Sequence, residues 1–119
     1  MIVLIGGEKG GTGKTTLATN LAQMRAARGH DVLLVDTDKQ ESASSWASLR
    51  AEEGIDPTIT AVQKLGKNIT RDLGDLAKRY DDLVIDAGGR DSFELRAALV
   101  ATEQIFIPVQ ASQFDVWTL

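Results

Sequence analysis

The sequence of 119 residues predicts one α/β domain built on a mostly parallel β-sheet. Short apolar runs, rich in β-branched residues, occur at 2–5, 32–35, 58–62, 83–85 and 105–107. Continuous runs of this kind are typical of parallel strands buried on both faces, although the run at 58–62 is weaker than the others. Helix-like stretches separate the runs, at 15–28, 41–53, 68–80 and 92–101. This alternation is typical of right-handed crossovers between parallel strands.

The first helix-like stretch, at 15–28, has apolar residues at helical spacing. Leu17, Leu21 and Met24 recur at helical spacing, with Ala18 and Ala22 beside them. A glycine at position 29 then provides a stop signal. The stretch therefore predicts an amphipathic helix directly after the first strand and its loop.

Composition excludes several classes of protein. The hydrophobic share of 43% and charged share of 25% are ordinary for a soluble domain, and the net charge of −4 gives no standing attraction to DNA or anionic membranes. The absence of cysteine excludes disulfides, thiolate metal sites and iron–sulfur clusters, and one histidine cannot build a zinc site. No apolar run approaches the roughly 18 residues of a membrane span. We therefore expect a cytoplasmic protein that uses no membrane.

The segment at 7–16, GEKGGTGKTT, follows the first strand and opens the first helix. Glycines let the backbone N–H groups approach phosphate oxygens, and a helix N-terminus adds unpaired donors. Lys14 is placed to reach the β- and γ-phosphates, and the Thr15 hydroxyl can bind Mg²⁺. A glycine-rich turn without a ligand is the alternative, but the Lys-Thr pair and the strand-loop-helix context disfavour it. The predicted nucleotide-binding residues are Gly10, Gly11, Thr12, Gly13, Lys14, Thr15 and Thr16.

Two further runs end in aspartates. Asp36 and Asp38 follow the run at 32–35, and Asp86 follows the run at 83–85. Ligands of open α/β sheets bind beyond the carboxyl ends of the strands. A carboxylate there can hold a Mg²⁺-bound water or orient the attacking water for phosphoryl transfer. The alternative role for each is a helix cap or a solvated loop residue. Asp36 is the most ambiguous of the three, and a role in supporting other ligands is an alternative for it.

These motifs resemble the ParA/MinD family of deviant Walker A ATPases. KGGTGKTT (9–16) is similar to the family's phosphate loop, whose mark is the early second lysine, here Lys9. VDTDKQESASSW (35–46) resembles switch I, and LVIDAGGRDS (83–92) resembles Walker B with switch II. FIPVQASQFD (106–115) resembles the next strand and loop. The likeness is closest to small plasmid-partition ParA proteins that lack an N-terminal DNA-binding extension.

The resemblance implies a three-layer P-loop NTPase fold with strand order 3-2-4-1-5. It implies ATP/ADP and Mg²⁺ as ligands, and a homodimer that sandwiches nucleotide. It also implies non-specific DNA binding, nucleoid association in the ATP state, and a centromere-binding partner protein that stimulates slow hydrolysis. Relatives of this kind segregate or position plasmid or chromosomal DNA.

By position in these motifs, the resemblance also implies residue roles. Lys9 would neutralise the nucleotide of the sister subunit, and Lys14 would bind the β- and γ-phosphates. Thr15 would bind Mg²⁺, with Asp86 holding it through water and Asp36 nearby. Asp38 would organise the attacking water, and Thr16 would contact the α-phosphate.

Three departures from the family pattern qualify these roles. Lys39 precedes Gln40 where proline is usual, and residues 87–89 read Ala-Gly-Gly where prolines are frequent. The family's chains also continue well past this length, so residues 1–119 are expected to be one P-loop ATPase domain from the N-terminal part of a longer chain. Other functions on this fold stay open: a MinD-like or cargo-positioning ATPase, a small-molecule ligase, and a nucleotide switch without hydrolysis.

Overall fold

A computed structural model describes residues 1–6, 14–37, 42–66, 68–87 and 93–106. Its strands are β1 Ile2–Ile5, β2 Val32–Asp36, β3 Thr60–Gln63, β4 Asp82–Asp86 and β5 Gln104–Phe106. Its helices are α1 Lys14–Ala27, α2 Ser42–Glu52, α3 Ile69–Ala77 and α4 Phe93–Ala101. The strands pair in parallel in the order β3-β2-β4-β1-β5. The predicted fold class and strand order are therefore confirmed.

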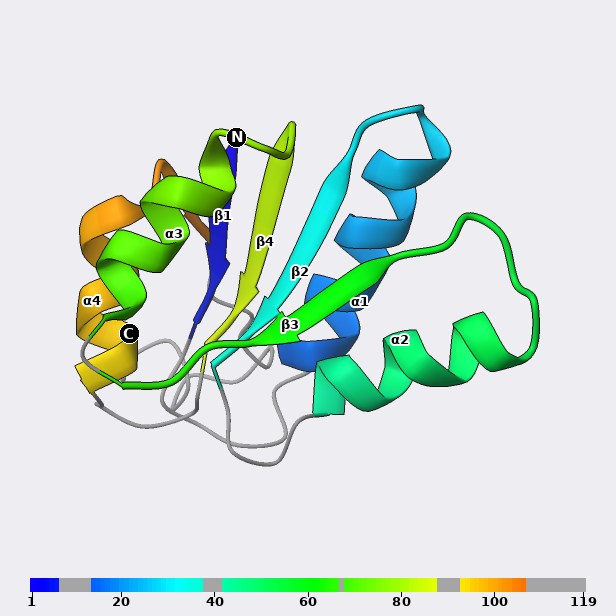
Figure 1. The fold of residues 1–119 in the computed structure, drawn as a ribbon, viewed down its shortest axis with the longest axis horizontal. Coiled ribbons are helices and arrows are strands. Elements are labelled where there is room, and N and C mark those ends of the chain that lie inside the picture. Colours follow the sequence, from blue (N-terminus) through cyan, green and yellow to red (C-terminus); the bar gives the residue numbers. More distant parts are fainter. Residues whose placement is uncertain (7–13, 38–41, 67, 88–92, 107–119) are drawn as a thin grey trace, which may run out of the picture.

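The helices cover the sheet on both faces. Figure 1 shows α1 and α2 on one side of the strands and α3 and α4 on the other. Two apolar clusters fill the two interfaces. One contains Val3, Ile5 and Leu34 beneath α1 and α2, and the other contains Leu4 and Leu33 beneath α3 and α4. Adjacent residues of one strand thus belong to opposite layers, which explains why the apolar runs are continuous rather than alternating.

The strands differ from their predicted limits at charged residues. β2 extends to Asp36, and β4 runs from Asp82 to Asp86, so acidic residues lie within the strands and are buried. The apolar runs end before these acidic residues, and the partners that a buried carboxylate needs are not visible in the local sequence. The weaker run was also misplaced, since β3 covers Thr60–Gln63 rather than 58–62. Residue 107 of the last predicted run lies outside the described residues.

Small side chains form the buried face of α1. Ala18 and Ala22 are completely buried, and Leu21 packs beside the same cluster. Leu17 and Met24 are instead 37% and 47% exposed. The same holds for α2, where Ala43 and Ala47 are buried. Alanines bring the helix axes close to the sheet, so the larger residues of the predicted stripe lie at the margin or outside.

A charged cluster holds together the amino ends of β1 and β4. Arg25, near the end of α1, donates from Nε to Asp82 Oδ2 at 2.8 Å, and the Met1 ammonium lies 3.5 Å from Asp82 Oδ1. Burial alone would raise the pKa of Asp82, but the hydrogen bond and charge of Arg25, with smaller effects of the ammonium and His30, lower it below its ordinary value. The cluster lies at the opposite end of β4 from the predicted site.

Candidate functional site

The carboxyl ends of the central strands carry a row of polar side chains. Asp36 pairs in register with Asp86 on one side and with Gln63 on the other, and Asp86 also pairs with Ile5. Ile5 belongs to the cluster beneath α1 and α2, and in-register neighbours of a sheet share a face. Both aspartates therefore lie on the side of α1 and α2. They are 0% and 3% exposed, so they belong to the interior of the site rather than to a solvated loop.

Thr15 connects the first turn of α1 to the end of β4. Its hydroxyl donates to Asp86 Oδ2 at 2.8 Å, although 71 residues separate the two in the sequence. The hydroxyl of Thr19, one turn later, donates to the carbonyls of Thr15 and Thr16 at 2.9 and 3.1 Å. The Thr15 bond holds the beginning of α1 against Asp86, and the Thr19 bonds lie within the first turns of the helix. The structure therefore brings together two residues that the sequence predicts as Mg²⁺-binding.

Asp36 faces the beginning of α2. Its Oδ2 accepts a long hydrogen bond of 3.4 Å from the backbone N–H of Ser44, in the first turn of that helix. A carboxylate at a helix N-terminus is stabilised by unpaired N–H groups and by the helix dipole. The alternative role considered for Asp36, that of a helix cap, thus has a structural basis. The same carboxylate lies one strand away from Asp86, so it also adds negative charge to the site.

Thr37 was not singled out by the sequence, yet it contacts the same strand end. Its backbone N–H and its hydroxyl both donate to the carbonyl oxygen of Asp86, each at 3.1 Å. Thr37 is 5% exposed and lies between two predicted site residues. A threonine within a D-x-D pattern is the available signal, but the pattern does not show which atom the hydroxyl meets.

The oxygen donors at this site suit a hard divalent cation. Thr15 and Asp86 offer a hydroxyl and a carboxylate, and Asp36 supplies a second carboxylate on the adjacent strand. Mg²⁺ prefers such oxygens and keeps several waters, so few protein ligands are sufficient. Two neighbouring carboxylates in a buried setting also favour a cation, because a positive charge between them offsets their mutual repulsion. The described residues therefore fit Mg²⁺.

Several predicted residues lie outside the described part of the chain. They are Lys9, Gly10, Gly11, Thr12, Gly13 and Asp38. Lys14 begins α1, but its side chain is also outside the description. Thr16 is described and exposed in the first turn of α1. The structure thus shows the strand and helix that flank the phosphate loop, and the roles within the loop stay predictions.

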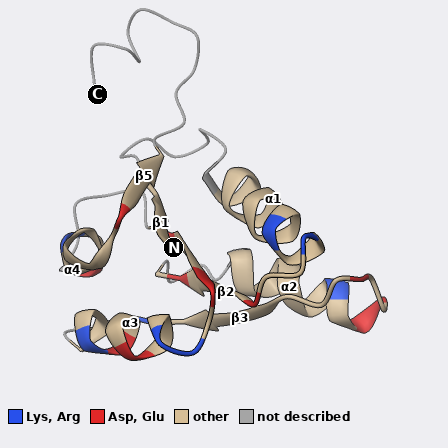
Figure 2. Cartoon of the chain, turned by 90° about the horizontal axis from the view of Figure 1, so that it is seen from above, with Lys and Arg blue, Asp and Glu red and all other residues tan. Residues whose placement is uncertain are grey.

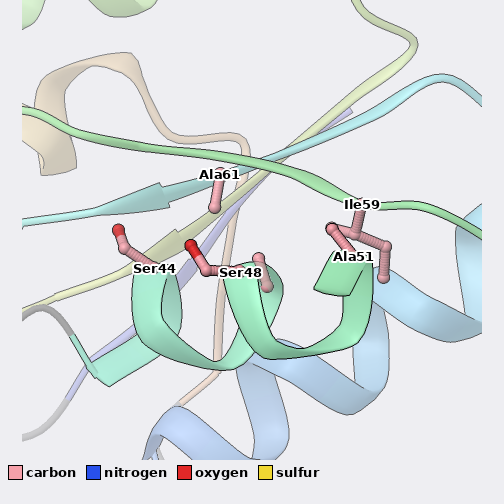
Figure 3. A pocket seen from close by; sticks show the side chains of 6 residues that line it. Ser44, Ser48, Ala51, Ile59 and Ala61 are labelled. Carbon is pink, nitrogen blue, oxygen red and sulfur yellow. The ribbon is translucent and has the colours of Figure 1, made fainter. Parts of the chain in front are cut away.

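A separate hollow of about 190 Å³ lies between α2 and the edge strand β3. It is lined by Ser44, Ala47, Ser48, Ala51, Ile59 and Ala61. Figure 3 shows Ser44 and Ser48 on α2 and Ala61 on the strand opposite them. None of these six residues is charged or belongs to the predicted site. The lining of this hollow offers no charged side chain to neutralise a triphosphate.

Comparison with known families agrees with this geometry. The sequence model of the CobQ/CobB/MinD/ParA nucleotide binding domain matches residues 3–107. The chain belongs to this family. The predicted resemblance is therefore confirmed, and the polar strand ends described above are those of a nucleotide-binding domain.

Curated relatives of this family member act in DNA partition and in the distribution of protein compartments. The chain is 37% identical to maintenance of carboxysome distribution protein A of Gloeobacter kilaueensis, over 99% of this chain and 53% of the relative. It is 32% identical to the chromosome-partitioning ATPase Soj of Thermus thermophilus, over 94% of this chain and 55% of the relative. The chain thus spans about half the length of these relatives.

A solved structure shares the fold. A plasmid partition protein of Borrelia burgdorferi, bound to AMPPNP, matches with a TM-score of 0.79 at 24% identity, over 98% of this chain and 64% of that protein. At this identity the likeness is one of fold. Within the described ranges, no helix of this family member has the length and apolar character needed to cross a membrane.

Proposed function

We propose that the protein containing this chain is a ParA-type ATPase that binds Mg²⁺-ATP and hydrolyses it slowly, with stimulation by a partner. The observation that carries this proposal is the Thr15–Asp86 hydrogen bond. It joins the first turn after the phosphate loop to the end of the adjacent strand, where an oxygen-binding cation has to sit to reach the β- and γ-phosphates. Family membership over residues 3–107 supports the same activity.

The proposal assigns each residue a role by its place in the sequence motifs. The N–H groups of Gly10, Gly11, Thr12 and Gly13 would surround the phosphates, Lys14 would neutralise their charge, and Thr16 would contact the α-phosphate. Thr15 and Asp86 would hold Mg²⁺, with Asp36 supporting them. When bound, Mg²⁺ would neutralise the charge that develops between the β- and γ-phosphates. Asp38 would orient the attacking water.

Lys9 would extend this site across a homodimer, by reaching the nucleotide of the sister subunit. The complete protein would then bind non-specific DNA only as the ATP dimer, and hydrolysis stimulated by a centromere-binding protein would release it. Acidic residues lie among the basic ones on α3 and α4 (Figure 2), so we place the DNA-binding surface outside these two helices.

The test is ATP turnover by the complete protein, measured with and without DNA and a partner protein. We expect Lys9→Ala to abolish ATP-dependent dimerisation in light scattering, while ATP still binds the monomer within a few-fold of the wild-type affinity. Lys78→Ala, which removes a similar charge just beyond α3, should leave dimerisation unchanged. ATP-dependent dimers of Lys9→Ala would rule out the sandwich mechanism.

A second candidate function is the positioning of a protein compartment rather than of DNA. It is supported by the 37% identity to a carboxysome distribution protein. Both cargoes require the same ATPase site, so turnover alone does not separate them. Deleting the gene distinguishes them: plasmid or chromosome loss supports DNA partition, and clustering of a protein compartment with normal DNA inheritance supports organelle positioning. ATP turnover that is unaffected by DNA and requires a small-molecule acceptor would instead indicate a ligase on this fold.

A further inference from the structure

The hydroxyl of Thr37 makes a hydrogen bond that the sheet itself does not require. The backbone N–H of Thr37 bonds to the Asp86 carbonyl at 3.1 Å and continues the ladder one residue past β2. The hydroxyl adds a second bond to the same carbonyl, also at 3.1 Å. Any residue except proline can make the first bond, whereas only serine or threonine can make the second with so short a side chain.

We call the residue that directly follows the carboxyl end of a strand its exit. The exits of the neighbouring strands show what the backbone hydrogen bonds of the sheet provide without such a side chain. Gly6 N–H bonds to the Phe106 carbonyl at 2.9 Å, and Ala87 N–H bonds to the Ile5 carbonyl at 3.1 Å. Lys64 N–H bonds to the Asp36 carbonyl at 2.9 Å. Of these four described exits, the one at Thr37 has an added side-chain bond to the same acceptor. The extra bond lies at the exit that leads directly to Asp38.

Asp86 is therefore fixed from two sides. Its carboxylate accepts the hydroxyl of Thr15, and its carbonyl accepts both donors of Thr37. The three residues form a continuous connection from α1 through β4 to the end of β2. This connection fixes the position of Thr37, the residue before Asp38 in the sequence, relative to Asp86. Phosphoryl transfer is sensitive to small errors in the position of the attacking water.

We propose that Thr37 is a positioning residue for hydrolysis: its hydroxyl fixes the exit of β2 to Asp86, so that the water-orienting and cation-binding carboxylates keep a constant relative position. The inference rests on the proposed ATPase function. It assigns Thr37 to the hydrolytic step rather than to nucleotide binding, because the phosphate loop follows β1 and not β2.

Two substitutions separate the hydroxyl from the rest of the side chain. In the complete protein, Thr37→Val keeps the volume and loses the bond, and Thr37→Ser keeps the bond. We expect Thr37→Val to lower kcat about tenfold while ATP affinity changes less than about threefold, since one hydrogen bond is lost at an orienting position. Thr37→Ser should recover most of the rate. Thr102→Val is the matched control, because the Thr102 hydroxyl bonds to the Ala98 carbonyl at 2.6 Å, next to the end of α4.

A purely structural role predicts a different pattern. Thr37→Val and Thr102→Val would then lower the melting temperature by similar amounts, and both would leave kcat unchanged. That result would overturn the proposal, as would a loss of rate that Thr37→Ser fails to recover.

Hydrogen exchange tests the bond independently of catalysis. Thr37→Val should speed amide exchange in peptides covering 36–44 and 84–90, and Thr37→Ser should not. If the wild-type protein hydrolyses no ATP, the proposed function fails, and the exchange result still decides whether the hydroxyl fixes these two segments. Unchanged exchange in Thr37→Val would overturn the positioning role whatever the activity.

Discussion

Replacing Asp86 by asparagine should lower the ATP turnover of the complete protein by about 100-fold, because the residue supplies charge where Mg²⁺ is proposed to bind. Asparagine has the same size, and its amide oxygen can still accept the hydrogen bond that Thr15 donates at 2.8 Å. The substitution therefore removes charge with little change of shape. The measurement is steady-state phosphate release as a function of Mg²⁺ concentration. We expect the half-maximal Mg²⁺ concentration to rise by at least about tenfold.

Two comparisons make this result specific. Asp75→Asn removes the same charge from an exposed position of α3 and should leave turnover unchanged. Thr15→Val, which removes the donor of this hydrogen bond, should cost less in the Asp86→Asn background than in the wild type, since a hydrogen bond to a neutral amide is weaker than one to a carboxylate. Normal Mg²⁺ dependence in Asp86→Asn would show that the cation is held elsewhere.

The second large effect concerns stability and lies at the other end of β4. Asp82→Asn should lower the free energy of unfolding by about 2 kcal/mol, because it removes the acceptor of the Arg25 ion pair from a position that is 1% exposed. This loss of stability is smaller than for a fully buried ion pair, because water reaches Arg25 and can partly solvate its unpaired charge. Urea denaturation at neutral pH measures the difference. Nucleotide affinity should not change, because the cluster lies at the opposite end of β4 from the proposed site.

The pH dependence of this effect has a definite sign. The folded-state pKa of Asp82 is lowered from the ordinary value of 3.8, so the folded protein holds this proton less tightly than the unfolded chain does. The contribution to stability is complete above that ordinary value and is lost as the pH falls through the lower folded-state value. The difference between wild type and Asp82→Asn should thus be constant near neutral pH and shrink in acid. A difference that grows below pH 3.8 would contradict the ion pair as its source.

Most of the architecture could be predicted from local patterns, and the deviations have a common cause. Apolar runs identified the strands, but they missed Asp36, Asp82 and Asp86 as strand residues. The partners that make burial of Asp82 and Asp86 tolerable, Arg25 and Thr15, lie 57 and 71 residues away. Only the folded chain brings these partners together, so a local pattern cannot anticipate them.

The site shows the same division. The positions of Asp36 and Asp86 at the strand ends were predictable, because residue type and strand position together indicate them, while the phosphate loop stays a prediction. The function of Thr37 was not predictable, since its hydroxyl meets a backbone carbonyl, and a sequence carries no mark of which carbonyl lies nearby. Which face of a helix is buried was similarly hard to predict. Leu17 and Met24 are more hydrophobic than Ala18, yet Ala18 is the one that is buried, because close packing against the sheet favours a small side chain.

The order of the strands also has a consequence for how the protein is made. β1, which leads into the phosphate loop, is synthesised first, but its two neighbours in the sheet are β4 and β5. Ile2 pairs with Leu83, so β1 has no sheet partner until most of the domain has left the ribosome. Contacts this distant in sequence form late and slowly. We therefore expect ribosome-bound chains that end before β4 to retain no nucleotide, and those that extend beyond β5 by the length of the exit tunnel to begin to bind it.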